Sequence, residues 1–400
     1  MKYFLLPLST HTKEIEASPN GNLLMTGTFS LVSRLSFLVV YIALVGLSSC
    51  DLPQNNTDPI GPAVFATLET SPVQSTGDAA DDPAIWLHPS DPQRSLIFGS
   101  DKQAGVYAFS MRGKQAAYYP IGKINNIDIR YDFPLPKGPV DILAGSNRTV
   151  NGLVVYSIDR KNGLLRNLTP EPFLSDLPDV YGFCLYHSRT DSQYYAFVVS
   201  TTGAIEQWRI IPNIDGFAAG EIVRKFEMGS KTEGMVADDE QGFVFIAQED
   251  SSIWRIPADP EHPADKFLVA SISQNDQLKG DLEGVALYYA AEGKGFLLAS
   301  SQGNNSYAVF EREAPYAYLG SFHIADSAAI DGAEDTDGIE VTNRPIGDFS
   351  QGVFVVQDGF NKGAEGKDLR QNFKLVPWEN MANLWGVNGL VDTAYQVFGR

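Results

Sequence analysis

Acidic residues recur in pairs and short groups along this 400-residue chain, at the ends of apolar segments and in turns. These groups are Asp81-Asp82, Glu233-Gly234, Glu249-Asp250, Asp281 to Gly284, Asp331 to Asp337, and Gln357-Asp358. A single pair of this kind is usually a turn or a solvated edge. Carboxylates that converge on one place repel one another, however, and stay ionised only with cations among them. Oxygen ligands without His or Cys favour calcium, so the acids predict calcium sites wherever the fold gathers them.

Two basic residues, Lys102 and Arg148, each follow a polar cluster that closes an apolar segment. An Arg can contact a phosphate through two hydrogen bonds, and a Lys supplies a point charge. Two interpretations are open on the residues alone. The pair either binds a phosphorylated ligand or balances the charge of the acids at the surface.

The elements that position these residues form a repeat. A short apolar strand, a polar cluster, and a second strand recur six times, beginning with SLIFGSDKQAGVYAF (95–109) and ending with GVFVVQDGF (352–360). The polar residues that close the first strands are Ser100, Ser146, Ser200, Gln248, Ser301 and Gln357, a spacing of roughly fifty residues. A strand repeat of this length indicates propeller blades, whereas a sandwich has strands every 8–12 residues without a longer period. We predict an all-β, six-bladed β-propeller over 81–400, with the polar ends gathered at one face of the channel.

Composition narrows the function classes. The formal net charge is −19, so the chain repels nucleic acid, and it would repel a polyanionic small molecule unless divalent cations intervene. The chain has two cysteines, Cys50 and Cys184, and five histidines without HxxxH or CxxC spacing. We expect neither a disulfide framework nor a zinc or iron site.

The first fifty residues predict export. An apolar run ends in Leu47-Ser48-Ser49-Cys50, is preceded by Arg34, and is too short for a comfortable membrane span. The closing LSSC resembles a bacterial lipobox, so we assign 1–50 as a signal peptide with lipidation at Cys50 and consider Met25 a better start. Residues 51–80 are rich in Pro, Asn, Thr, Ser and Gly and predict a flexible tether. Cys184 is then expected in the core. We expect the protein to be exported and either anchored by its lipid on the periplasmic side of the cell envelope or secreted.

Several long motifs closely resemble bacterial β-propeller phytases, from about Gly77 to Glu379. They are GDAADDPAIWLHP (77–89), GKINNIDIRYDFP (122–134), VYGFCLYHS (180–188), KTEGMVADDE (231–240), LLASSQGNNSYAVFER (297–312), DTDGIEV (335–341) and QNFKLVPWE (371–379). The resemblance implies a six-bladed, calcium-dependent 3-phytase that acts on phytate (myo-inositol hexakisphosphate) as a calcium complex. It implies several bound calcium ions.

Position by position, the resemblance also implies a set of site residues. Asp82 with the backbone carbonyls of Pro83 and Ile127 would form one structural calcium site, and Asp331, Asp358 and Asn361 a second. The catalytic calcium ligands would be Glu233, Glu249, Asp281, Glu283, Gln302 and Asp337. The phosphate-binding residues would be Lys102, Arg148 and Tyr181, the last also counted as catalytic.

Three positions depart from the family pattern. Gln103 and Thr201 stand where lysines are expected, which weakens the adjacent phosphate subsite. Phe360 stands at a usually acidic position of the QDGxN loop, which puts the affinity of one structural calcium in doubt.

The mechanism that we expect is attack of a calcium-activated water on a phosphate monoester, with Lys102 and Arg148 stabilising the transferring group. Two alternatives use the same fold: a calcium-dependent lactonase, which would not need the two basic residues, and a non-catalytic envelope propeller that binds partners. We expect a monomer that contacts no nucleic acid and meets a membrane only through its lipid anchor.

Overall fold

The computed structural model of the chain describes residues 58–396. The predicted signal peptide, the start at Met25 and the lipidation site Cys50 lie outside these residues. Within them, short strands follow one another with few helical turns between, and they form six sheets whose pairings are antiparallel except that of β1 (Ala63–Val64) with β23 (Tyr318–Ile324).

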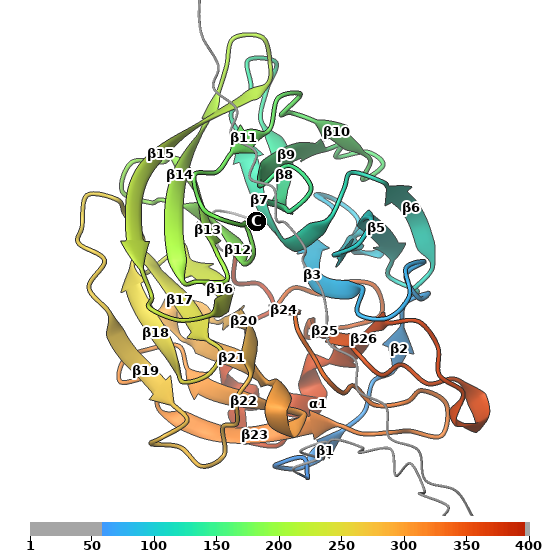
Figure 1. The fold of residues 1–400 in the computed structure, drawn as a ribbon. Helices are drawn as coiled ribbons and strands as arrows, with labels where there is room; N and C mark the ends of the chain where they lie inside the picture. Colours follow the sequence, from blue (N-terminus) through green and yellow to red (C-terminus); the bar gives the residue numbers. More distant parts are fainter. Residues whose placement is uncertain (1–57, 397–400) are drawn as a thin grey trace, which may run out of the picture. The chain divides into compact units, whose positions relative to one another are not determined.

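The six sheets follow one another along the chain and are arranged around a central axis (Figure 1). From inner to outer strand, the first blade consists of β3 (Ala80–Trp86), β4 (Leu96–Asp101), β5 (Gly105–Ser110) and β6 (Gln115–Tyr119). The second consists of β7 (Ile124–Phe133), β8 (Val140–Asn147), β9 (Gly152–Ile158) and β10 (Leu165–Asn167), with β11 (Phe173–Leu174) also paired to β9. The third consists of β12 (Phe183–His187), β13 (Tyr194–Val199), β14 (Ala204–Pro212) and β15 (Ala218–Glu227). The last three are β16 (Thr232–Asp238), β17 (Phe243–Gln248), β18 (Ser252–Pro257), β19 (Phe267–Ser271); β20 (Leu282–Tyr289), β21 (Gly295–Ser301), β22 (Ser306–Glu311), β23 (Tyr318–Ile324), β1 (Ala63–Val64); and β24 (Ile339–Thr342), β25 (Val353–Asp358), β26 (Asn372–Pro377), β2 (Leu68–Glu69).

Each inner strand contacts the inner strand of the next sheet, from β3 through β7, β12, β16, β20 and β24 and back to β3. The predicted six-bladed β-propeller is therefore confirmed. The remaining regular elements are the helix α1 (Trp378–Ala382) and five 3-10 turns: η1 (Pro92–Arg94), η2 (Ala291–Gly293), η3 (Gln302–Asn304), η4 (Ala364–Gly366) and η5 (Val387–Leu390).

The strands read as continuous apolar runs because both of their faces are buried between blades. In β13, Tyr194, Ala196 and Val198 pack toward the second blade, whereas Tyr195, Phe197 and Val199 pack toward the fourth. Six such apolar clusters fill the six gaps between neighbouring blades. Cys184 lies in one of them and is buried, as predicted.

The repeat in the sequence corresponds to the second and third strands of each blade and not to the innermost strand. Ser100, for example, lies in β4, and the inner strand β3 precedes it. Some of the acids that the sequence placed at strand ends therefore lie within the inner strands. These strands have polar residues near their beginnings, so the sequence pattern does not show that the acids belong to a strand.

The ring is closed by residues that the sequence assigned to the tether over 51–80. β2 pairs antiparallel with β26 and completes the sixth blade, and β1 pairs parallel with β23 of the fifth. In Figure 1 the blue strand β2 accordingly lies beside the red strand β26. The prediction of a flexible tether is therefore wrong for the part of 51–80 that contains β1 and β2. Two-residue strands are too short to show an alternating pattern in the sequence, but the open edge of a three-stranded last blade requires a partner strand.

A β-bulge recurs at the start of four inner strands. In β3, β7, β16 and β20 the pairing skips from the first residue to the fourth, so that two residues lie opposite one on the neighbouring strand. The first of the two residues in each bulge is Asp81 in β3, Asn125 in β7, Glu233 in β16 and Glu283 in β20. A bulge redirects its side chains locally, and here the same irregularity presents four polar side chains at the same end of the channel.

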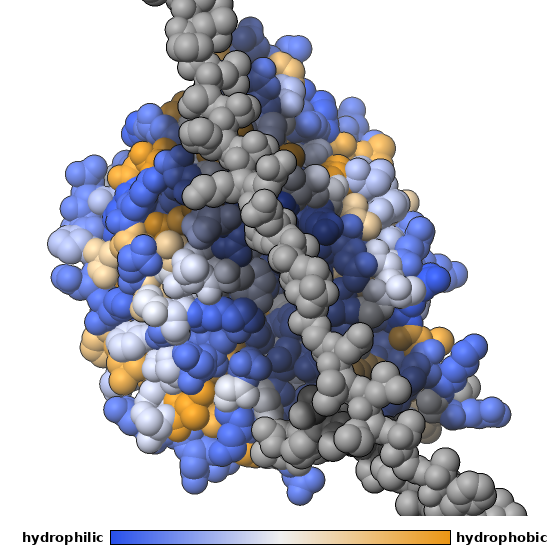
Figure 2. Space-filling model, viewed as in Figure 1, coloured by the Kyte–Doolittle hydropathy of each residue, from blue (hydrophilic) through white to orange (hydrophobic). Residues whose placement is uncertain are grey.

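Hydrophilic side chains predominate on the face seen in Figure 2, with apolar ones scattered between them. Among residues 58–396, no helix is both long and apolar enough to cross a bilayer.

Candidate metal centre and phosphate groove

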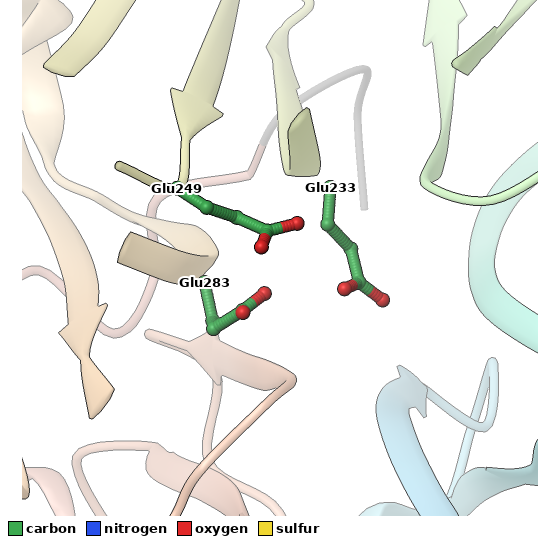
Figure 3. A group of neighbouring side chains, drawn as sticks. All are labelled: Glu233, Glu249 and Glu283. Atoms are coloured by element: carbon green, nitrogen blue, oxygen red, sulfur yellow. The ribbon is translucent and has the colours of Figure 1, made fainter. Parts of the chain in front are cut away.

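Three glutamates from two neighbouring blades point their carboxylates toward one space (Figure 3). Glu233 and Glu283 come from the bulges of β16 and β20, and Glu249 comes from the turn after β17. One carboxylate oxygen from each lies within 4.8 Å of the others, and all three side chains are buried. The structure thus brings together three of the predicted catalytic acids.

The electrostatics of this cluster fit a divalent cation. Burial, followed by the charge of Asp337, raises the pKa of Glu233 to about 7. Burial and the neighbouring glutamates raise the pKa of Glu283 well above its usual range. Oε1 of Glu249 and Oε2 of Glu283 are buried without a hydrogen-bond partner. Unpartnered carboxylate oxygens at this depth are costly, and hard-oxygen coordination of calcium would satisfy them.

Asp337 connects the glutamates to the basic side of the site. Its Oδ1 accepts a hydrogen bond from Gln302 Nε2 at 2.7 Å, and its Oδ2 accepts one from Lys102 Nζ at 2.7 Å. Lys102 also pairs with Asp81 Oδ1 at 3.1 Å and Asp78 Oδ1 at 2.6 Å. Burial raises the pKa of Asp337 to about 7 although Lys102 opposes the shift.

Asn125 lies between the acids and Arg148. Its Nδ2 donates to Glu233 Oε1 at 2.6 Å and to Asp81 Oδ2 at 3.2 Å, while its Oδ1 accepts from an Arg148 nitrogen at 3.2 Å. Tyr181 is hydrogen-bonded to Glu233, and the Arg148 guanidinium lies 5.9 Å from the centre of its ring. The predicted phosphate-binding residues thus adjoin the predicted metal ligands.

Asp281 is the most exposed of the six predicted ligands of this cluster. Its side chain is exposed, although its charge contributes to raising the pKa of Glu249, after burial. The backbone carbonyl of Asp281 accepts a hydrogen bond from Gln302 N at 2.9 Å. Asp281 therefore lies at the rim of the cluster.

A groove of about 570 Å³ opens beside the cluster, and its lining includes three cations, Lys102, Lys123 and Arg148, and two aspartates, Asp78 and Asp179. The two departures from the family pattern lie near it, and their side chains are used internally. Gln103 Nε2 donates to the carbonyls of Thr76 and Asp78. Thr201 Oγ1 donates to Asp179 Oδ2 at 2.7 Å.

Four residues of the site were missed as site residues from the sequence. Asp81, Asn125, Lys123 and Lys231 are all within the network or line the groove; Lys231 Nζ pairs with Glu249 Oε2 at 2.6 Å. Asp81 was visible as half of an acidic pair, and its bulge explains why it and Asp82 face different places. Lys123 lies in the connection before β7 and not after a second strand, so the repeat gave no signal for it.

Asp82 lies farther along the channel. Together with Pro83 and Ile127 it lines a cavity of about 30 Å³, which Asp128 and Glu340 also reach. Its Oδ2 accepts a hydrogen bond from Ile127 N at 3.0 Å. Burial and then the charge of Asp81 raise the pKa of Asp82. The three residues predicted for this structural calcium are thus adjacent, and the cavity is large enough for one ion or water molecule.

Asp331, Asp358 and Asn361 form a separate cluster, and it is already built around a cation. The ammonium of Lys374, which is fully buried, contacts all three side chains. In the glutamate cluster, by contrast, a half-exposed ammonium pairs with one of the three carboxylates, Lys231 Nζ with Glu249 Oε2 at 2.6 Å.

The fold and the site define a class of protein: a six-bladed propeller whose channel holds buried carboxylates beside a groove with three cations. The sequence profile of the phytase family matches residues 31–398. A curated 3-phytase of Bacillus subtilis (strain 168) is 44% identical over 328 residues, which is 81% of this chain and 85% of that protein. The chain belongs to the phytase family, and the predicted family and class of enzyme, a 3-phytase, are confirmed.

Two of the solved structures that the chain resembles have low sequence identity to it. A protein of unknown function from Desulfotomaculum acetoxidans DSM 771 is 15% identical, with a TM-score of 0.40 over 60% of this chain and 70% of that one. A luciferin-regenerating enzyme is 8% identical, with a TM-score of 0.46 over 76% of this chain and 95% of that one. Neither likeness bears on the function.

Proposed function

We propose that this chain releases phosphate from phytate in a calcium-dependent reaction at the glutamate cluster. The observation that carries the proposal is the convergence of the Glu233, Glu249 and Glu283 carboxylates, two of them with an unpartnered buried oxygen, next to a groove with three cations. A site of this kind favours a ligand that is itself a polyanion bound with divalent cations.

Glu233, Glu249 and Glu283 would hold the calcium ions, with Gln302 and Asp337 beside them. Calcium, when bound, would neutralise phosphoryl oxygens and lower the pKa of a bound water. The chain's own residues supply the rest. Tyr181 and Asn125 fix the orientation of Glu233 through hydrogen bonds.

The basic residues would bind the substrate. Arg148 presents a planar donor set suited to a phosphate, while Lys102 and Lys123 provide point charges along the same groove. Lys102 is held by Asp337, Asp81 and Asp78, so it faces both the metal cluster and the groove. Stabilisation of charge on the transferring phosphoryl group is the largest contribution that such residues can make.

The net charge of −19 is consistent with this proposal, because calcium brings the acidic protein and the polyanionic substrate together. The test is phosphate release from phytate across a calcium titration, for the wild type and for Glu283→Gln. We expect release to rise with calcium in the wild type and to stay near background in the variant. Equal rates in the two proteins would refute the role of the cluster.

Two additional measurements address the alternative functions, a lactonase and a non-catalytic binding propeller. A lactone is assayed beside phytate: calcium-dependent lactone hydrolysis without phosphate release would favour a lactonase. Calorimetry with phytate, with and without calcium, distinguishes a binding propeller, which would bind without turnover.

We further propose that the protein is exported as a monomer and held in the cell envelope by a lipid on Cys50. The sequence of the apolar run and LSSC supports this. Export and detergent-phase partition of the full chain are compared with those of Cys50→Ala, which we expect to leave the membrane fraction. A variant that stays there would show that no lipid at Cys50 is needed.

A further inference from the structure

The ring closes at a cross-strand pair of opposite charge. Glu69 of β2 lies directly opposite Lys374 of β26 in the antiparallel register. The Lys374 side chain has no solvent exposure, and its Nζ lies 2.5 Å from Glu69 Oε2. The two residues are 305 positions apart in the chain, so this contact connects its N-terminal and C-terminal strands.

Three further oxygens surround the same ammonium. Nζ contacts Asp331 Oδ1, Asp358 Oδ2 at 3.2 Å and Asn361 Oδ1 at 3.2 Å. The contact with Asp358 is an ion pair without hydrogen-bond geometry. We call Glu69, Asp331, Asp358, Asn361 and Lys374 the closure cluster.

The second carboxylate oxygens of the two aspartates, Asp331 and Asp358, are satisfied by backbone N–H groups. Asp331 Oδ2 accepts from Lys362 N at 2.5 Å. Asp358 Oδ1 accepts from Glu334 N at 3.2 Å and from Phe360 N at 3.3 Å. The donors fix both aspartates so that their remaining oxygens face the ammonium.

A calcium ion does not fit this arrangement. It requires six to eight oxygens, whereas the closure cluster directs four at its centre and has an ammonium there. Phe360, in the loop between Asp358 and Asn361, contributes no side-chain oxygen and is 48% exposed. A dication and a buried ammonium on the same oxygens would repel each other strongly.

We propose that the Lys374 ammonium is the resident cation of the closure cluster, in place of a calcium ion, and that it joins β2 to β26. The sequence-based assignment of Asp331, Asp358 and Asn361 as calcium ligands is replaced by this one. Calcium is then needed at the glutamate cluster but not for closing the ring.

The first test counts calcium. Metal bound per chain is measured after dialysis for the full-length wild type, Asp331→Asn and Asp358→Asn. We expect the same number of calcium ions in all three. A loss of one ion in either variant would overturn the proposal.

The second test removes the lysine. Lys374→Met leaves three carboxylates without their cation, and breaking a buried ion pair is strongly destabilising. We expect its Tm in chelator to fall by about 5 °C or more, and added calcium to raise it further than it raises the wild-type Tm. Lys362→Met, which changes an exposed lysine of the neighbouring loop, is the control and should keep the wild-type Tm. A Lys374→Met protein as stable in chelator as the wild type would contradict the inference.

A third measurement needs no variant and decides the matter if the variants do not fold. Thr67 N and Thr70 N donate to the carbonyls of Leu375 and Phe373 across the closure. We expect these amides to stay protected from hydrogen exchange in chelated wild-type protein. Loss of their protection on chelation would show that the closure depends on calcium.

Discussion

Replacing one carboxylate of the glutamate cluster should have opposite effects on stability with and without calcium. In Glu283→Gln the side chain keeps its shape but loses its charge. In the wild type, one carboxylate oxygen of Glu283 lies within 4.8 Å of carboxylate oxygens of Glu233 and Glu249. Two ionised carboxylates at that distance repel by about 3.5 kcal/mol at an effective dielectric constant of about 20, or about 7 kcal/mol for the two neighbours.

Protonation relieves part of that repulsion, since burial and neighbouring charges raise the pKa of Glu233 to about 7 and that of Glu283 well above its usual range. We therefore expect Glu283→Gln to be more stable than the wild type in chelator at pH 8 by about 2 kcal/mol, which is about 3 °C in Tm for a folded unit of this size. In saturating calcium the order should reverse, because the variant has lost a ligand.

The assay is thermal unfolding in chelator and across a calcium titration, beside phosphate release from phytate. Glu311→Gln, an exposed glutamate on β22 of the same blade, is the matched control. We expect Glu283→Gln to reduce turnover by about 100-fold or more and the control to behave as wild type. A variant less stable than the wild type in chelator, or one with an unchanged calcium-induced rise in Tm, would refute the electrostatic reasoning.

Three further predictions concern other parts of the channel. Chelation should abolish phosphate release, and calcium should restore it; full activity in chelator would rule out the proposed function. Lys123→Met should raise the KM for phytate several-fold while kcat stays within about twofold, because the groove loses one of three cations; Lys137→Met is the control, and a changed kcat with the same KM would place Lys123 elsewhere in the reaction. Burial and the charge of Asp128 raise the pKa of Glu340 from 4.5 to about 8, so the folded state binds more protons between these values and stability should fall as pH rises through them. Glu340→Gln should make this fall smaller in chelator, with a gain of about 2 kcal/mol or more at pH 8 in urea unfolding. Parallel pH profiles for the two proteins would contradict this prediction.

The blades were predictable because their physics is local and repeated. Strands such as β13 are buried on both faces, so every position in them is apolar. The same apolar run therefore recurs in the sequence of each blade. The gathering of Glu233, Glu249 and Glu283 was also predictable, but only through resemblance to a family, since one acidic pair does not reveal which of its members faces the axis. Asp81 and Asp82 show this: the register skip in β3 separates their directions.

The remaining features depend on contacts that no local pattern records. β2 has two residues and no alternation, yet the open edge of the last blade recruits it. Lys374 has the appearance of an ordinary strand residue in QNFKLVPWE, and its role depends on Glu69 near the other end of the chain. Long-range pairing of this kind is decided by the closed ring as a whole.

The repeated bulge has a consequence for how such a site can change. Four blades offer the same backbone opening, and the side chains in it are an aspartate, an asparagine and two glutamates, at positions 81, 125, 233 and 283. Because the opening is made by the strand pairing, the residue in it can be exchanged without altering the sheet. The channel is therefore modular: charge, reach and hydrogen-bonding capacity can be adjusted one blade at a time, which leaves selection or design free to alter the chemistry of the axis on an unchanged scaffold.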